Sequence, residues 1–246
     1  MHGGAAFETV ADHLEQPFRR ARALADALED IDRLLERGGR DRRLGEFAGE
    51  FRVARLEPGR FLDEPGAIVV SVAAGVTIAS LEALLPEGVA VLRAMPNTPS
   101  LIGRGITGIA AGGSAGPEAV ETVERLFSTV GEVLVVREDQ INAVTAISGS
   151  GPAYLFLYAE EMTGAARRPG FHDAQAALLV QQTIAGAAEL MIRSDKDPAQ
   201  LRRDVTSPKG TTERAVEVLQ AAGWGELFDR ALAANIRRSE ELEAGD

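Results

Sequence analysis

The stretch AISGSGPAYLF, from Ala146 to Phe156, separates two parts of the chain that differ in character. An apolar run enters the stretch and an aromatic-aliphatic run leaves it, so both flanks must be buried. Glycine-serine runs usually form flexible linkers, but this one is too short and its flanks are too hydrophobic for that role. Because small side chains let helix axes approach closely, we predict a tight helix–helix crossing here.

Strands and helices alternate before this stretch, across residues 64–138. AIVVSVAA (67–74) is a short β-branched run of the type buried in a parallel sheet, and the runs VAVLRAM (89–95), GITGIAAGG (105–113) and GEVLVVR (131–137) predict three more strands. Thr77 stands near the start of one predicted helix and Pro117 opens another. The alternation predicts an α/β fold with a partial, Rossmann-like parallel sheet.

Only helical periodicity follows, across residues 139–246, with breaks at glycine and proline. The predicted fold class is therefore α/β and then all-α. Residues 1–63 are atypical: Leu24, Leu28, Ile31 and Leu35 form one helical stripe, and no convincing strand occurs. We accordingly expect three regions: an unassigned helix-rich segment 1–63, a partial α/β domain 64–138 and a helical domain 139–246; the resemblance described below implies dinucleotide binding for the second, and dimerisation and substrate binding for the third.

Composition narrows the function classes. The 246 residues carry a formal net charge of −11, which disfavours nucleic acid as a partner, and they include no cysteine for a disulfide or thiolate zinc site. The three histidines, His2, His13 and His172, do not cluster, so we expect no metal site. No apolar run approaches the roughly 20 residues that span a bilayer, and the first residues do not resemble a signal peptide. We expect a soluble cytoplasmic protein that binds no membrane.

Two polar loops carry the candidate chemistry. RAMPNTPSLIGRG (93–105) follows a predicted strand, and ligands gather at the carboxyl ends of strands in open α/β sheets. RRDVTSPKGTTERAV (202–216) opens a helix, whose N-terminal N–H groups favour an anion. A structural interpretation exists for each: Asn97 would bond its own backbone in a rigid turn, and the threonines of the second loop would only cap a helix.

Together with AVTAISGSGPAYLF and VSVAAGVTIASLE, these loops resemble the pyrroline-5-carboxylate reductase family from about Ile68 to Leu242. The resemblance implies reduction of L-1-pyrroline-5-carboxylate to L-proline with NADPH or NADH. It implies a Rossmann domain followed by a helical domain that interlaces with a second copy into a homodimer, with dimers often assembling into decamers. The implied active site lies between the nucleotide domain of one chain and the helical domain of its partner.

The resemblance also assigns residues to roles. Thr212 is the implied catalytic residue, which hydrogen-bonds the imine nitrogen as it becomes an amine. The implied carboxylate-binding residues are Ser207, Gly210 and Thr211, and the implied neighbours of the nicotinamide end of the cofactor are Met95, Pro96 and Asn97. The SGSGPAY loop would border the site, with Tyr154 and Phe156 in the core.

Two of the chain's departures from the family pattern affect the candidate site. Residues 1–63 contain no glycine-rich G-x-G-x-x loop for the cofactor pyrophosphate, and Lys209 stands where the family has glycine. Either the gene lost or replaced that half of the domain, or the segment is an out-of-frame reading of a G+C-rich gene, with which the absence of lysine before Lys196 is consistent. The chain is then a reductase with impaired cofactor binding, or a non-catalytic oligomerising relative. In both cases we expect weak or no NADPH binding.

Overall fold

The computed structural model describes residues 66–244, so the predicted helix across Leu24–Leu35 lies outside the described residues. The chain divides into two compact units. The first contains the described residues up to Ser150 together with those from Asn235 onward, and the second contains Gly151–Ala234. Each unit is described by itself.

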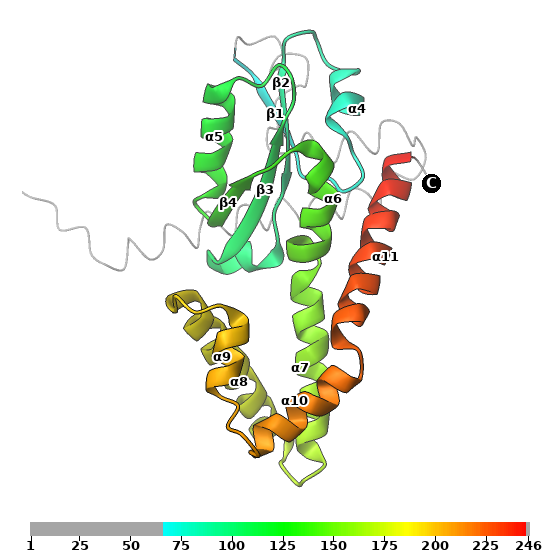
Figure 1. The fold of residues 1–246 in the computed structure, drawn as a ribbon. Coiled ribbons are helices and arrows are strands. Elements are labelled where there is room, and N and C mark those ends of the chain that lie inside the picture. The colour runs from blue at the N-terminus through cyan, green and yellow to red at the C-terminus, as the bar shows by residue number, and fades with distance from the viewer. Residues whose placement is uncertain (1–65, 245–246) are drawn as a thin grey trace, which may run out of the picture. The chain divides into compact units, whose positions relative to one another are not determined.

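A four-stranded sheet organises the first unit (Figure 1). Its strands, in the order β1-β2-β3-β4, are β1 (Ile68–Ser71), β2 (Ala90–Met95), β3 (Gly105–Ala111) and β4 (Gly131–Val135). β1 pairs in parallel with β2, and β3 with β4, but β2 and β3 run antiparallel. The sheet is therefore mixed, which corrects the expectation of a parallel sheet. Only a short segment with one 3₁₀ turn, η1 (Thr98–Ile102), joins β2 to β3, whereas a parallel crossover needs a dozen or more residues.

Two helices in this unit begin where the sequence predicted. Helix α4 (Ile78–Glu82) is capped by Thr77, whose Oγ1 accepts a hydrogen bond from the Ser80 N–H at 3.1 Å. Helix α5 (Pro117–Phe127) has proline at its first position. Side chains alternate along β2, so Leu92 contributes to one core and Val91 to the other.

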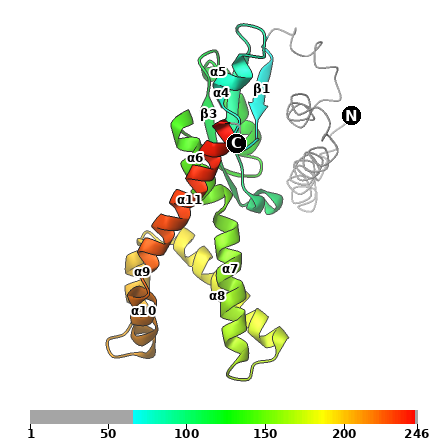
Figure 2. The same cartoon turned by 90° about the vertical axis from the view of Figure 1, so that its right-hand side faces the viewer.

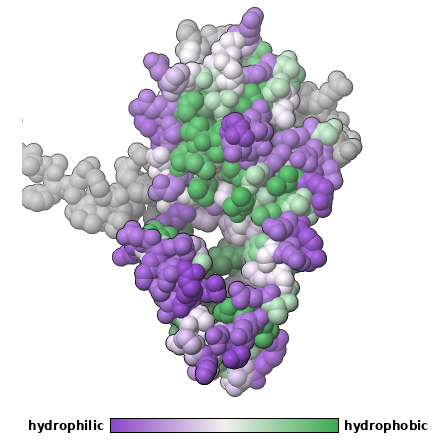
Figure 3. Space-filling model, viewed as in Figure 1, coloured by the Kyte–Doolittle hydropathy of each residue, from purple (hydrophilic) through white to green (hydrophobic). Residues whose placement is uncertain are grey.

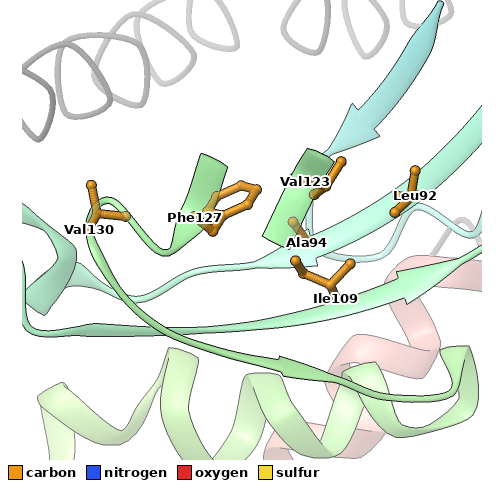
Figure 4. Packing of buried hydrophobic residues seen from close by; sticks show 6 residues of the cluster. All are labelled: Leu92, Ala94, Ile109, Val123, Phe127 and Val130. Atoms are coloured by element: carbon orange, nitrogen blue, oxygen red, sulfur yellow. The ribbon is translucent and has the colours of Figure 1, made fainter. Parts of the chain in front are cut away.

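Each face of the sheet has its own hydrophobic core. The cluster that includes α5 is drawn in Figure 4 and consists of Leu92, Ala94, Ile109, Val123, Phe127 and Val130. The cluster that includes α4 consists of Ile78, Leu81, Val91, Ala110 and Ile141. The two cores fix β2 between them, and the candidate turn Met95-Pro96-Asn97 lies where this strand ends.

A π-helical turn lies at the end of the first unit. After η2 (Glu138–Gln140) and α6 (Ile141–Val144), the chain forms η3 (Thr145–Gly149), in which the Ser150 N–H donates to the Thr145 carbonyl at 2.8 Å. A β-carbon on Gly149 would lie 2.9 Å from Met95 Cε, whereas one on Gly151 would meet nothing within 4 Å. Among the described residues, this stretch therefore lies close to the end of β2, and its Ser150 hydroxyl also accepts a hydrogen bond from Asn235 of the helix Trp224–Ala244. The tight helix–helix crossing stays a prediction.

A buried arginine links the last turns of α11 (Trp224–Ala244) to the sheet. Arg93 of β2 is only 3% exposed, and its Nη1 lies 3.3 Å from Glu138 Oε1 and 3.1 Å from Glu243 Oε1. The Asn142 side-chain amide donates to the other Glu243 oxygen at 3.1 Å. Figures 1 and 2 both show this end of α11 beside α6.

The second unit is helical in all its residues that form regular structure. It comprises α7 (Gly151–Arg167), α8 (Asp173–Arg193), α9 (Pro198–Asp204), α10 (Thr211–Ala221) and the first part of α11. Each of these helices matches a segment predicted from the sequence. None of the helices in the described part of the chain is both long and apolar enough to cross a membrane.

Many large apolar side chains of the second unit are exposed in the single chain. Phe156 is 66% exposed, Ile192 69% and Val218 71%. Figure 3 shows hydrophobic residues reaching the surface among hydrophilic ones on the face in view. Phe156 is therefore not a core residue within one chain, which corrects its predicted place, and Tyr154 is half-buried.

Candidate functional site

The predicted site residues fall into two groups, one in each unit. The first group is the turn Met95-Pro96-Asn97, where β2 ends and η1 begins. All three residues are half-buried. The carboxyl end of β2 therefore presents a short rigid turn, at the sheet position where ligands of α/β proteins bind.

The Asn97 side chain joins two segments that are distant in sequence. Its Oδ1 accepts a hydrogen bond from the Ile106 N–H at 3.0 Å, and its Nδ2 donates to the Ser148 carbonyl at 3.1 Å. Neither partner belongs to the residue's own turn, so the interpretation that Asn97 bonds its own backbone is wrong. The 93–105 loop and the SGSG stretch were both candidates from the sequence, but nothing in the sequence indicated that this amide connects them.

The SGSG stretch thus lies against the Met95-Pro96-Asn97 turn. Gly149 packs on Met95 Cε, and the Ser150 hydroxyl accepts a hydrogen bond from Asn235 Nδ2 at 2.9 Å. Asn235, in α11, is a contributor that sequence reasoning missed, because nothing in its helical segment distinguishes it from other polar surface positions. The expectation that the SGSGPAY loop borders the candidate site agrees with these contacts.

The second group occupies a tight turn and the helix that follows it. The Gly210 N–H donates to the Ser207 carbonyl at 2.9 Å, which places Pro208 and Lys209 at the centre of the turn. Lys209 has a φ of 61°, and positive φ at the second central residue, after proline at the first, is typical of a type II turn. Glycine is the usual residue there because it lacks a β-carbon. The Lys209 N–H donates to Glu213 Oε2 at 2.8 Å, which ties the turn to α10.

The N-terminus of α10 is open to a ligand. Its N-cap is Gly210, and no described side chain accepts a hydrogen bond at this cap. Thr211 and Thr212 are the first two helical residues and both are exposed, as is Ser207. The threonines therefore do not cap the helix, and the interpretation that they only do so is wrong. Hydroxyls and N–H groups of a helix's first turn provide donors and a favourable dipole for an anion.

The described residues fit only part of a dinucleotide. The turn after β2 offers a rigid backbone surface for a nicotinamide ring. One stretch of the described chain, Gly103 to Gly108 (GRGITG), has the G-x-G-x-x-G spacing, but it leads into strand β3. A pyrophosphate site of this type needs a strand followed by a helix, whose N-terminus binds the phosphates. This stretch therefore does not supply one.

Comparison with known proteins agrees with the motifs. Residues 138–242 match the family model described as pyrroline-5-carboxylate reductase dimerisation. A pyrroline-5-carboxylate reductase of Pseudomonas aeruginosa is 45% identical over 180 residues, which cover 73% of this chain and 66% of that protein. The chain thus spans just under two thirds of the length of this relative.

Solved structures show the same relationship. A pyrroline-5-carboxylate reductase from Coxiella burnetii is 41% identical with a TM-score of 0.71, and the match covers 74% of this chain and 68% of that one. A Plasmodium falciparum pyrroline carboxylate reductase with NADP bound is 28% identical with a TM-score of 0.67, covering 72% and 71% of the two chains. The fold and the relatives confirm the resemblance seen in the motifs, and the chain belongs to the pyrroline-5-carboxylate reductase family.

Proposed function

We propose that this protein reduces L-1-pyrroline-5-carboxylate to L-proline with NADPH or NADH, at a rate limited by weak cofactor binding. The observation that carries the proposal is the uncapped N-terminus of α10, where a family motif presents exposed hydroxyls and N–H groups. The identity to known reductases, 45% for the Pseudomonas aeruginosa protein, supports the same substrate.

The substrate carboxylate would bind at the turn and first residues of α10. Ser207, Gly210 and Thr211 supply a hydroxyl, a backbone N–H and a helix N-terminus, respectively. An anion at a helix N-terminus gains typically 0.3–1 kcal/mol from the helix dipole at an exposed site. Lys209 lies between these residues in sequence, and its ammonium group adds positive charge at the same turn.

Thr212 would orient the reacting nitrogen. The cofactor supplies a hydride to the imine carbon when it is bound, and the electron pair of the C=N double bond then moves to the nitrogen, which takes up a proton. The Thr212 hydroxyl hydrogen-bonds this nitrogen, and the proton arrives through Thr212, water or solvent. The protein contributes orientation and electrostatics, and it forms no covalent bond to the substrate.

The protein would bind NADPH or NADH mainly through the nicotinamide end of the cofactor. Met95, Pro96 and Asn97 form the surface for the ring at the end of β2. Residues 1–63 contain no G-x-G-x-x sequence, and the glycine-rich turn of the described chain, GGSAG (112–116) between β3 and α5, lacks the full G-x-G-x-x-G spacing. Without backbone N–H groups for the two phosphates, affinity for NADPH is low.

The proposed working form is a cytoplasmic homodimer, in which dimers can assemble into decamers. The match of residues 138–242 to a dimerisation model supports association through the helical region. Exposed apolar side chains on α7, α8 and α10, among them Phe156, Ile192 and Val218, support it as well. Large exposed apolar surface on one chain is typical of a protein–protein interface.

The test is direct measurement of proline. The purified protein is incubated with pyrroline-5-carboxylate and millimolar NADPH or NADH, and proline is quantified by mass spectrometry. Thr212→Ala should lower turnover about three- to tenfold, since a neutral hydrogen bond is worth roughly 0.5–1.5 kcal/mol, with little loss of stability. Thr122→Ala, on the exposed face of α5, is the matched control and should leave turnover unchanged. Equal turnover in Thr212→Ala and the wild type would remove Thr212 from the mechanism.

A second candidate function is a non-catalytic, oligomerising member of the family. The absence of a glycine-rich loop from residues 1–63 favours it. A folded dimer that forms no proline even at millimolar cofactor would select this candidate over the reductase.

A further inference from the structure

We infer that the side-chain amide of Asn97 is a positioning group, which holds the π-helical turn η3 against the end of β2 and does not itself contact the cofactor. This role deepens the proposed function: the backbone of the Met95-Pro96-Asn97 turn forms the nicotinamide surface, and the Asn97 side chain holds η3. Only the kinetic consequence rests on the proposed function, because the hydrogen-bonded bridge from Asn97 to Ser148 can be measured by folding experiments without any activity.

A proline removes one alternative partner for the Ser148 carbonyl. With the α-helical spacing of α7, which begins at Gly151, this carbonyl would accept a hydrogen bond from the N–H of the residue four positions later. That residue is Pro152, which has no N–H. The Asn97 side chain donates to the Ser148 carbonyl at 3.1 Å, so it supplies the donor that Pro152 cannot.

Both polar ends of the amide are engaged. While Nδ2 donates to Ser148, Oδ1 accepts from the Ile106 N–H at 3.0 Å, at the start of β3. The amide therefore links β3 to η3, and asparagine is the residue of this size that donates at one end and accepts at the other. Aspartate would keep the acceptor for Ile106 but place a second oxygen against the Ser148 carbonyl.

The hydrogen bond from Asn97 to Ser148 keeps Gly149 next to the Met95 side chain. A β-carbon on Gly149, the residue after Ser148, would lie 2.9 Å from Met95 Cε. A shift of η3 away from the sheet would therefore remove the surface on which the Met95 side chain packs. Met95 borders the proposed nicotinamide surface, so Asn97 acts on that surface through η3. π-helical turns often occur at functional sites, and the Asn97 side chain contacts this one from outside the turn.

A double-mutant cycle between Asn97 and Pro152 tests the bridge. Asn97→Ala should lower the equilibrium constant for folding about tenfold in urea titrations at one fixed protein concentration. In a Pro152→Ala background, residue 152 gains an N–H that can serve the Ser148 carbonyl, and the loss should shrink to about threefold or less. If Asn97→Ala does not fold, Asn97→Ser in the same cycle gives the comparison.

Two further variants separate the two bonds of the amide. Asn97→Asp keeps the bond to the Ile106 N–H but removes the donor to the Ser148 carbonyl. It should still lower the equilibrium constant for folding about tenfold. Asn142→Ala is the matched control: it removes an asparagine amide bonded to Glu243 in the same unit, and its effect should not change with Pro152→Ala. A wild-type-like Asn97→Asp would overturn the inference, as would equal effects of Asn97→Ala in both backgrounds.

Kinetics test the positioning role. Asn97→Ala should lower kcat while the KM for NADPH changes less than about twofold, and Pro152→Ala should restore part of kcat. A raised KM with unchanged kcat and no restoration would show direct cofactor contact and overturn the inference. If the wild-type protein forms no proline, the proposed function fails, and the folding cycle still decides whether the bridge exists.

Discussion

Lys209 adopts a backbone conformation that residues with a β-carbon disfavour. It is the only non-glycine residue of the described chain with positive φ, at 61°, and it lies in the turn before α10. A residue with a β-carbon pays roughly 1–2 kcal/mol for this conformation. The fixed φ of Pro208, the bond from the Gly210 N–H to the Ser207 carbonyl, and the bond from the Lys209 N–H to the Glu213 carboxylate hold the turn in place.

Replacing Lys209 by glycine should therefore stabilise the protein. The relief of strain exceeds the added entropy of glycine in the unfolded chain, so Lys209→Gly should raise the free energy of unfolding by about 0.5–1 kcal/mol in urea titrations. Lys209→Ala is the control, because it removes the charge and keeps the β-carbon. An equal gain in both variants would mean that the lysine charge, and not its backbone conformation, is unfavourable.

At the level of elements, the buried arginine links β2 to the last turn of α11. Arg93 lies on β2 between the two cores, and its guanidinium pairs with Glu138 near α6 and Glu243 in the last turn of α11. The two carboxylates are partly exposed, at 35% and 21% of their side chains, while the arginine side chain is 4% exposed. Removing the arginine leaves two carboxylates facing one another, whereas removing one carboxylate leaves an ion pair.

The two substitutions should differ accordingly. Loss of one partner of a buried pair costs about 3–5 kcal/mol, and solvent access to the carboxylates reduces this, so Arg93→Met should cost about 2–3 kcal/mol. Glu243→Gln should cost about 1 kcal/mol, because Glu138 still pairs with the arginine. Urea unfolding measures both values. A Glu243→Gln variant as destabilised as Arg93→Met would show that Glu243 is the essential member.

Periodicity in the sequence was sufficient to predict the elements, but not how they combine. The β-branched runs and the helical stripes predicted the described strands and helices because burial imposes those periods locally. The antiparallel pairing of β2 with β3 depends on the length of one connection, and the Arg93 pairs join residues separated by up to 150 positions. The bridge from Asn97 to Ser148 is equally non-local. The site motifs were found because they occur in unbroken stretches.

At the scale of the molecule, the described residues include many large apolar side chains that are exposed in the single chain. The helical unit presents Phe156, Ile192 and Val218 at 66%, 69% and 71% exposure, together with many other large apolar side chains. Apolar surface on this scale marks an interface, and stable interfaces bury about 1,200–2,000 Å² or more. Association through residues 143–243 would cover it.

Sedimentation equilibrium at micromolar concentration should therefore show a dimer or a larger assembly. Replacing Phe156 and Val218 by glutamate should weaken association, because each places a charge on a surface that is apolar in the single chain. Glutamate at Thr122, on the exposed face of α5, is the control and should not affect association. A stable, fully folded wild-type monomer would contradict this assignment of the interface.

The central claim is that the chain keeps the substrate and nicotinamide parts of the family's site without a pyrophosphate site. Calorimetric titration of the purified protein with NADPH, alongside reduced nicotinamide mononucleotide, tests it most directly. We predict a folded dimer that does not saturate with NADPH in the micromolar range and binds the two compounds with similar low affinity. Micromolar binding of NADPH, much tighter than that of the mononucleotide and accompanied by proline formation, would show that residues 1–63 supply a phosphate site and would contradict the claim.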